Sequence, residues 1–562
     1  MEPISRESSA RAGRAMRRRD FLRLGGVAGL GAALAGVLGA CGGPSATPTA
    51  ATGGGPATVG APRATGPSTP AAGSAAGSPG TAGAKPTGKL TVGVGALPAT
   101  LDPHLNNSGV SFATYFQLYE GLTNITADGK LEPALATSWQ YVDDKTLELK
   151  LRQGVVFHNG EPFDADAVKW NVERILNPQT KSVVKSRIPT VDHVEVLDPA
   201  TVRLVLSAPA ALLVKALSVV FMIPPKYFAA QGGSDGFVKK PVGTGPFMFT
   251  AGAPADYIQF AANDRYWRGQ PKLAAVEYKA LPEAGARLAA LQSGQVDLIQ
   301  NLPVINVEQI QAAGFQISEA FQSRMHVINF MIPIVPQLKD KRVRQALNYA
   351  VDKQALVTKI MRGHAKISQG QLLGEDGVGY NPNVKAYPYD VAKAKQLLAD
   401  AGAANLELTC FVTDGAYIQD KDTMQAVAGM LQDAGVKVTL QPIEFSAFSQ
   451  KFFANTLTGL NLQGMNYFPV EDADFVFANY LSDAVARMYA NPDFDKALRA
   501  SEQELDEQRR LKQLQDIDSM LYDDPPVIFL FQPPDLFGVA KNVAGFTARH
   551  DARIDLLGVT KA

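Results

Sequence analysis

One short motif in the chain has the spacing of a serine nucleophile. Gly232-Gly-Ser-Asp-Gly236 matches the Gly-x-Ser-x-Gly pattern, in which a strand leads into the serine and a helix follows it. Residues 227–231 have the composition of a helix end, and Phe237 is followed within a few residues by Pro241 and a turn. This context predicts a flexible loop, so we expect no catalytic residue there. A secreted hydrolase remains the alternative class.

The histidines and cysteines are too scattered to build a metal site or a disulfide framework. The six histidines stand apart, with no HExxH pair, at positions 104, 158, 193, 326, 364 and 550. The two cysteines are Cys41 and Cys410, and Cys410 lies in a strand-like run where we expect a small buried hydrophobe. No dinucleotide-binding or Walker motif is present. The sequence therefore predicts no metal and no cofactor.

The charge distribution argues against a nucleic-acid partner. Lys plus Arg and Asp plus Glu are equal at 54 each, but seven arginines and three acidic residues lie within the first 40 residues. The rest of the chain holds 47 basic and 51 acidic residues. It therefore lacks the basic surface that binding to phosphates requires.

The first 40 residues are typical of an export signal. Arg18-Arg19-Asp20-Phe21-Leu22-Arg23 resembles a twin-arginine signal, and the following residues 24–40 are uncharged and rich in Gly and Ala. A permanent membrane helix, the alternative, needs about 20 strongly apolar residues. Leu38-Gly39-Ala40-Cys41 resembles a lipobox, which implies that Cys41 is acylated and becomes the mature N-terminus.

Residues 41–87 have the composition of a tether. Beyond Cys41 they are almost all Gly, Ala, Pro, Ser and Thr, with Arg63 and Lys85 as the charged residues. Such a segment buries too little apolar surface to fold. We expect a disordered, lipid-anchored linker on the outer face of the bacterial cytoplasmic membrane, periplasmic or at the cell surface.

From residue 88 onward, strand and helix patterns alternate. Residues 90–94 and 147–151 have the period of strands. A helix is expected to begin at Asp164, the run 340–351 has an apolar helical face, and Asp390 is a candidate cap for a helix over 391–401. Later strands at 406–412 and 436–440 flank a helix at 423–433. Because a single core stops growing at about 250–300 residues, the sequence predicts an α/β protein with several lobes.

An ordered series of motifs gives the chain a family resemblance. The landmarks are Leu101-Asp-Pro-His104, Tyr119-Glu-Gly-Leu122, the segments 129–139 and 151–160, Pro241-Val-Gly-Thr-Gly-Pro-Phe247, Asn263-Asp-Arg-Tyr-Trp-Arg-Gly269 and the segment 343–352. Together they resemble the dipeptide and oligopeptide class of bacterial extracellular solute-binding proteins, family 5, from about Lys89 to about Val543. Most of them fit structural roles, such as the apolar anchors Trp139 and Trp267 and the turn at Gly243-Thr-Gly-Pro246.

The resemblance implies a fold like that of type II periplasmic binding proteins, with a ligand cleft between two large lobes. Lobe I is expected to comprise 88–118, 241–324 and 526–562, lobe II 119–240, and lobe III 325–525. The apolar runs 325–330 and 526–531 would connect lobes I and III as hinges.

The function that the resemblance implies is that of a monomeric, non-enzymatic receptor of an ABC importer. It would close around a peptide-like or other small solute and deliver it to a membrane permease, and ATP would be hydrolysed by separate subunits. A periplasmic chaperone or sensor-docking module using the same cleft is a further alternative.

One wall of the cleft in the peptide-binding relatives is an extended segment that pairs with the ligand like an added strand. Ser108-Gly109-Val110 occupies its place here. The same residues also suit an ordinary surface turn.

The opposite wall carries two aromatic elements in the family. Glu444-Phe445-Ser-Ala-Phe448 keeps the first with Phe in place of Trp, and the second becomes Gly464-Met465-Asn466-Tyr467-Phe468-Pro469. Phe468 then stands where the family's Asp binds a peptide ammonium, which predicts weak binding of free peptides. A pocket of Phe445, Met465, Tyr467 and Phe468 would favour apolar, aromatic or sugar-like solutes. Glu471, Asp472 and Asp474 are either substitute carboxylates or a solvated acidic turn.

Overall fold

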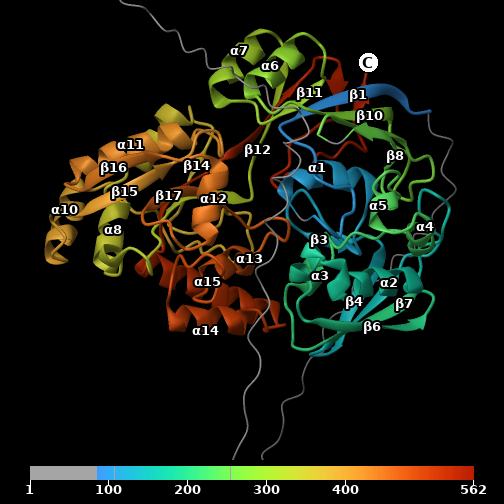
Figure 1. Ribbon diagram of the computed structural model, residues 1–562, viewed down its shortest axis with the longest axis horizontal. Helices are drawn as coiled ribbons and strands as arrows, with labels where there is room; N and C mark the ends of the chain where they lie inside the picture. Colours follow the sequence, from blue (N-terminus) through green and yellow to red (C-terminus); the bar gives the residue numbers. More distant parts are fainter. Residues whose placement is uncertain (1–84, 107, 254) are drawn as a thin grey trace, which may run out of the picture. The chain divides into compact units, whose positions relative to one another are not determined.

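The structure is a computed structural model that describes residues 85–106, 108–253 and 255–562. These residues contain three large β-sheets and two two-stranded sheets (Figure 1). The predicted signal 1–40, the acylated Cys41 and nearly all of the tether 41–87 lie outside these residues. Within them, the helices are all too short or too polar to span a bilayer.

A seven-stranded sheet contains the first described strand. Its order is β12-β19-β11-β1-β10-β9-β8, with β1 parallel to both β10 and β11. The strands are β1 (Thr87–Val94), β8 (Phe247–Ala253), β9 (Tyr257–Ala262), β10 (Leu273–Ala280), β11 (Leu298–Gln300), β12 (Gln316–Phe321) and β19 (Pro534–Val539). Helices of these segments are α1 (Gly109–Leu118), α6 (Ala284–Gln292) and α7 (Val307–Ala312). Leu90, Val92 and Val276 belong to the core of this sheet.

A four-stranded antiparallel sheet has the order β4-β5-β7-β6. Its strands are β4 (Ala136–Asp143), β5 (Thr146–Leu151), β6 (Val191–Asp198) and β7 (Thr201–Leu206), and the helices of these segments are α2 (Ala165–Leu176), α3 (Leu213–Ala216), α4 (Pro225–Ala230) and α5 (Ser234–Phe237). Leu147, Leu149 and Leu204 are fully buried in its own core, because alternate residues of a strand share one face. Nearby, β2 (Thr123–Ile125) and β3 (Leu131–Pro133) form a two-stranded ribbon.

A six-stranded sheet has the order β14-β18-β13-β17-β15-β16. Its strands are β13 (Arg324–Asn329), β14 (Lys366–Ile367), β15 (Glu407–Val412), β16 (Lys437–Pro442), β17 (Leu460–Asn466) and β18 (Val527–Gln532). Helices of these segments are α8 (Lys341–Tyr349), α9 (Lys353–Ala355), α10 (Val391–Asp400), α11 (Asp420–Asp433), α12 (Phe445–Phe453), α13 (Ala473–Phe477), α14 (Pro492–Ser501) and α15 (Glu507–Asp523). Figure 1 shows α11 beside β15 and β16.

The chain crosses twice between the six-stranded and seven-stranded sheets. The first crossing, Gln322 and Ser323, joins β12 to β13, and the second, Pro533, joins β18 to β19. The backbone N–H of Gln322 donates to the Pro533 carbonyl at 3.0 Å, and Gln322 Nε2 donates to the Pro534 carbonyl at 3.0 Å. The two crossings therefore lie side by side. They lie just outside the runs 325–330 and 526–531 that were predicted as hinges, which are mostly strands β13 and β18. The lobe boundaries themselves stay a prediction.

Several local predictions are confirmed. Helix α10 begins after the predicted cap Asp390, whose side chain accepts a hydrogen bond from the backbone N–H of Lys393, and α2 begins after Asp164 as expected. Asp164 and Asp340 also cap their helices, α2 and α8, in the same way. Cys410 is fully buried in β15, and burial raises the pKa of its thiol to about 12. The predicted end of the tether at residue 87 is wrong by one residue, since Thr87 already begins β1.

Candidate functional site

A cleft of ≈ 1680 Å³ opens between segments of the four-stranded and six-stranded sheets. One wall consists of residues from 182–190 and 208–216, which flank β6, β7 and α3. The other wall consists of the end of α12, the end of β17 and residues on and around α13. The volume exceeds the range of about 300–1,000 Å³ that is common for small-molecule sites. The cleft can therefore hold a solute of several residues in length.

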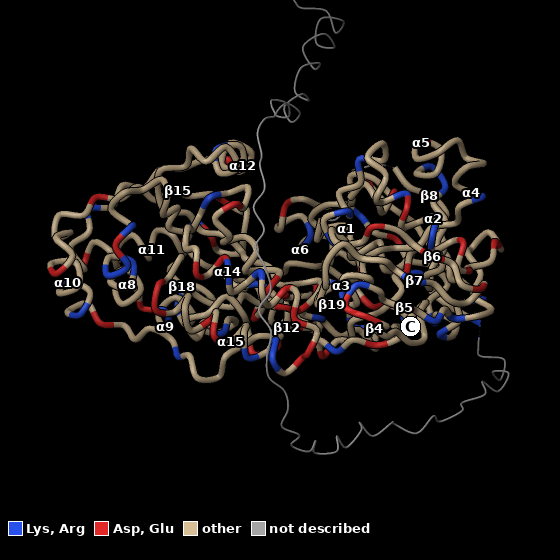
Figure 2. The backbone as a smooth tube through the Cα atoms, turned by 90° about the horizontal axis from the view of Figure 1, so that it is seen from below, with Lys and Arg blue, Asp and Glu red and all other residues tan. Residues whose placement is uncertain are grey.

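The surface of this cleft is markedly apolar for a surface open to solvent. Val183, Phe453 and Val485 line it and are 43%, 59% and 74% exposed. Exposed apolar patches on soluble proteins commonly mark binding sites. Figure 2 shows that Lys and Arg positions are interspersed with Asp and Glu positions along the described chain.

Three of the residues predicted to bind ligand lie on this cleft. Gly464, Met465 and Asn466 end strand β17 and line its six-stranded wall. A side chain at Gly464 would put its Cβ 2.4 Å from Cδ of Arg324, which explains why glycine stands there. Arg324 in turn donates from Nε to Asn466 Oδ1, and this bond holds the amide at the edge of the cleft.

The segment 108–110 differs from the expected extended wall. Gly109 and Val110 form the first turn of α1, and Ser108 is the residue before it. The prediction of an added-strand partner is therefore wrong for the backbone here. Gly109 allows a close approach instead, because a Cβ at this position would lie 2.9 Å from Cζ of Phe468.

The four side chains of the predicted aromatic pocket do not come together at the cleft. Met465 lines the cleft, and the other three do not. Phe468 is 6% exposed and packs against Phe112 in the core of the seven-stranded sheet, with ring centroids 6.2 Å apart. Tyr467 is fully buried, and its hydroxyl donates to Asp376 Oδ1 at 2.9 Å. Phe445 begins α12 and stacks on Phe448. Tyr467 and Phe468 are thus core residues, whereas Phe445 is 48% exposed and away from the cleft. A sequence pattern does not distinguish a core residue from a pocket residue.

Asp472 is neither a free carboxylate nor a solvated turn. It is fully buried and accepts two hydrogen bonds from Arg510, at 2.9 and 2.6 Å, and one from Lys215 at 3.2 Å. Arg510 also pairs with Asp474, which accepts a further bond from Ser501. Burial alone would raise the pKa of Asp472, but Lys215 and Arg510 hold it below its usual value. The predicted acidic turn is therefore a buried ion network that joins α3 to the segments around α13 and α15.

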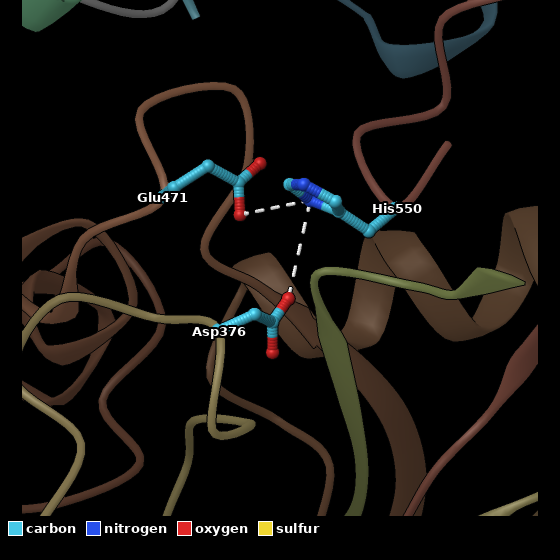
Figure 3. Close-up of side chains that lie close together, drawn as sticks. All are labelled: Asp376, Glu471 and His550. Atoms are coloured by element: carbon cyan, nitrogen blue, oxygen red, sulfur yellow. Dashed lines mark ion pairs between the residues drawn. The ribbon is translucent and has the colours of Figure 1, made fainter. Parts of the chain in front are cut away.

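Glu471 faces a different partner, His550 (Figure 3). Its carboxylate is fully buried and receives no hydrogen bond from the described residues, but its Oε2 lies 3.5 Å from His550 Nδ1. Asp376 Oδ2 lies 3.9 Å from the same nitrogen, and Ser323 Oγ 2.7 Å. His550 Nε2 donates to the Ala127 carbonyl at 2.6 Å. The three side chains of Figure 3 thus meet beside the first crossing segment.

His550 and Asp376 were missed at the level of sequence. Each is an isolated polar residue in a loop, and only the fold brings them to Glu471. Burial alone would lower the pKa of His550, but Glu471, with help from Asp551 and Asp376, raises it to about 9. The ring is therefore a cation at neutral pH, and the group is an ion cluster rather than a general base.

The serine motif also has a structural explanation. Ser234 begins the short helix α5, so the expected loop is wrong, and its Oγ donates to Asp102 Oδ2 at 2.7 Å. His104 Nδ1 lies 2.6 Å from an Arg174 nitrogen, and burial together with Arg174 lowers the pKa of His104 to about 4. The serine is thus bonded to a carboxylate that Arg174 already pairs. No histidine accepts its proton among the described contacts.

A family model described as bacterial extracellular solute-binding proteins, family 5 middle, matches residues 130–487. This is more than half of the chain. The chain belongs to this family.

The similar proteins agree with this membership in family 5. The glutathione-binding protein GsiB of Pectobacterium atrosepticum is 27% identical over 477 residues, which cover 82% of this chain and 91% of GsiB. The structure of the ABC transporter substrate binding protein CtaP from Listeria monocytogenes matches with a TM-score of 0.77 at 25% identity, over 85% of this chain and 100% of that one. The periplasmic binding protein DppA from Helicobacter pylori, solved with the peptide STSA, matches with a TM-score of 0.71 at 23% identity, over 84% and 98%.

These comparisons confirm the predicted α/β fold of periplasmic solute-binding proteins. They also confirm the predicted general function, since family 5 proteins bind solutes for ABC importers outside the cytoplasm. The similar proteins are binding proteins of transporters rather than enzymes.

Proposed function

We propose that this family 5 protein captures a short peptide or a peptide-like solute such as glutathione in the cleft beside β17, and delivers it to a membrane permease. The observation that carries the proposal is the cleft itself. Its wall contains Gly464, Met465 and Asn466 and faces residues 182–190. The exposed apolar side chains of Val183, Phe453 and Val485 also line it. The similar proteins GsiB and DppA are a glutathione-binding protein and a protein solved with a peptide, which supports this solute class.

Peptides suit the cleft physically. The predicted weak binding of free peptides rested on Phe468 in the cleft, and that ring lies in a core instead. Exposed apolar side chains such as Phe453 and Val485 can bury the side chains of a peptide. Closure of the two walls on hinge segments would then surround the solute, as in other binding proteins with lobes. The adjacent crossings at Gln322 and Pro533 are suitable hinge positions, because a few residues there carry the connection.

The test is a calorimetric screen of glutathione and of mixed di- to tetrapeptides against the purified protein, with mass spectrometry of solutes that it retains. A bound solute should stabilise the protein by about 2.7 kcal/mol at a hundredfold excess over its Kd. Val485→Trp, on the cleft, should weaken binding about tenfold, since overpacking costs about 1–3 kcal/mol.

Val142→Trp is the control, because Val142 is also an exposed valine, at 43%, on β4 and does not line the cleft. It should leave binding unchanged. Equal effects of the two substitutions would show that the solute binds at another site. Recovery of a chemically altered solute would show that the protein is an enzyme.

We propose further that the protein is monomeric and lipid-anchored through Cys41 on the outer face of the cytoplasmic membrane. The support is the run Leu38-Gly39-Ala40-Cys41 and the Gly- and Pro-rich residues that follow. Cys41→Ser should release the protein from membrane fractions. Full retention of this variant would contradict the anchor without affecting solute binding.

A further inference from the structure

Arg187 is a mostly buried cation that has no anionic partner among the described residues. It ends the 3₁₀ turn Val183–Arg187 on the wall of the cleft. No ion pair or hydrogen bond of its side chain occurs with another described residue, and its Nε is buried without an acceptor. Several other arginines with little exposed side chain are paired with carboxylates, as in Arg174 with Asp102, Arg510 with Asp472 and Arg549 with Asp551, and buried Arg287 donates to backbone carbonyls instead.

The contacts of Arg187 orient it toward the cleft. Its guanidinium lies 4.5 Å from the ring centroid of Phe475 on the opposite wall, within the range of a cation–π contact. Thr190 lies three residues further along the chain on the same wall. Its Oγ1 is buried and lacks a partner among the described residues. Two unsatisfied polar groups thus occupy one short segment of the cleft.

The carboxylates that line the cleft do not neutralise Arg187. Asp474 is held by Arg510 and Ser501, and Asp483 is paired with Arg499. Glu502 is the other carboxylate of the lining, and no ion pair joins it to Arg187 within the described chain. Burial lowers the pKa of Arg187 to about 10, so the guanidinium remains charged at neutral pH.

We propose that Arg187 and Thr190 form an anion subsite of the cleft, which receives a carboxylate of the bound solute. A cation withdrawn from water without a partner is costly, and a guanidinium can bind a carboxylate through two parallel N–H donors. Phe475 packs against the guanidinium as a ring with no acceptor for its N–H groups. A phosphate group offers the same chemistry. The inference rests on the proposed function, because it assigns the solute class for the same cleft.

The first experiment needs no identified solute. Thermal unfolding is measured in sodium acetate, sodium phosphate and sodium chloride at equal ionic strength, for the wild type, Arg187→Gln and the control Arg265→Gln, which changes an exposed arginine outside the cleft. Acetate should raise the Tm of the wild type and of the control relative to chloride, and should not raise that of Arg187→Gln. The same response in all three proteins overturns the subsite. A response to phosphate without one to acetate overturns the carboxylate assignment.

The second experiment compares a tripeptide with a free C-terminal carboxylate and its C-terminal amide by calorimetry. The acid should bind the wild type at least tenfold more tightly than the amide, Arg187→Gln should lose this preference, and Arg187→Lys should keep part of it. Equal binding of acid and amide to the wild type, or a preference that survives in Arg187→Gln, overturns the proposal. If neither peptide binds, the proposed peptide function fails for this solute, and the anion series still decides the subsite.

Discussion

Glu471 and Asp472 are neighbours in sequence, and both carboxylates are fully buried, yet they belong to opposite kinds of site. Asp472 receives three hydrogen bonds from two cations, whereas Glu471 receives none from the described residues and lies beside a single histidine. Asp472 connects to α3 and α15, and Glu471 to the C-terminal segment beside the first crossing. Burial alone therefore does not determine the role of a carboxylate. Its role depends on which cation it pairs with.

The two sites should differ in how they respond to pH and to substitution. A carboxylate held by Arg and Lys keeps its partners charged throughout the ordinary pH range. A carboxylate held by histidine depends on a proton that can be removed. The Asp472 network is therefore a permanent connection between segments, and the Glu471 cluster is one that titrates.

The largest effect is expected for Asp472→Ala. The substitution leaves Lys215 without its carboxylate and Arg510 with Asp474 alone. Removing one partner of a buried ion pair lowers the free energy of unfolding by about 3–5 kcal/mol, a loss that urea unfolding would detect. Asp516→Ala is the control, because Asp516 is exposed and pairs with exposed Lys512, and it should change stability by less than about 0.5 kcal/mol. A loss below 1 kcal/mol for Asp472→Ala would show that the network contributes little.

A smaller effect, with a defined pH window, is expected at His550. Its folded pKa of about 9 is above the unfolded value of 6.5, so its contribution is complete below about pH 6.5 and is lost as pH rises through about 9. The shift corresponds to at most about 3 kcal/mol. His550→Gln should remove this part of the pH dependence between pH 6 and 10.

The measurement is the difference between the unfolding free energies of wild type and His550→Gln across that range, because tyrosines and lysines titrate in both proteins alike. The difference should shrink as the pH rises. If the two curves stay parallel, His550 does not carry a raised pKa, and the contrast between the two carboxylates disappears.

The sequence could predict the fold far better than the contacts at the cleft. The helix start at Asp164 and the cap at Asp390 depend on local hydrogen bonds, so a local pattern was sufficient to predict them. The resemblance to the family placed Met465 on a wall of the cleft, and Met465 does line it. Burial of Phe468 against Phe112 did not, because those residues belong to different parts of the chain and a hydrophobic residue fits a core and a pocket equally well.

Arg187 shows the same limit for charges. The sequence of residues 182–190 does not distinguish Arg187 from a solvated surface arginine. Its lack of an anionic partner can be recognised only from the folded structure, in which Phe475 and the rest of the opposite wall lie against it. Sequence patterns record which residue types occur, and the pairing of buried charges depends on contacts between distant segments.

The smallest effect is expected for Lys215→Met, which separates the two cations of the Asp472 network. Asp472 keeps both hydrogen bonds from Arg510, and the Met side chain can fill the space of the lysine stem at a side chain that is 18% exposed. We expect a loss of about 1 kcal/mol, because a charge-assisted hydrogen bond is removed while the buried carboxylate stays paired.

Hydrogen exchange in α3 and in residues 466–472 should become faster, since Lys215 is the side chain that joins them. Lys239→Met, at an exposed lysine beyond α5 with no ion pair in the described chain, should change neither quantity. Equal exchange in the two variants would mean that α3 is held by its apolar contacts, such as Leu213 in the core, and that Arg510 alone satisfies Asp472.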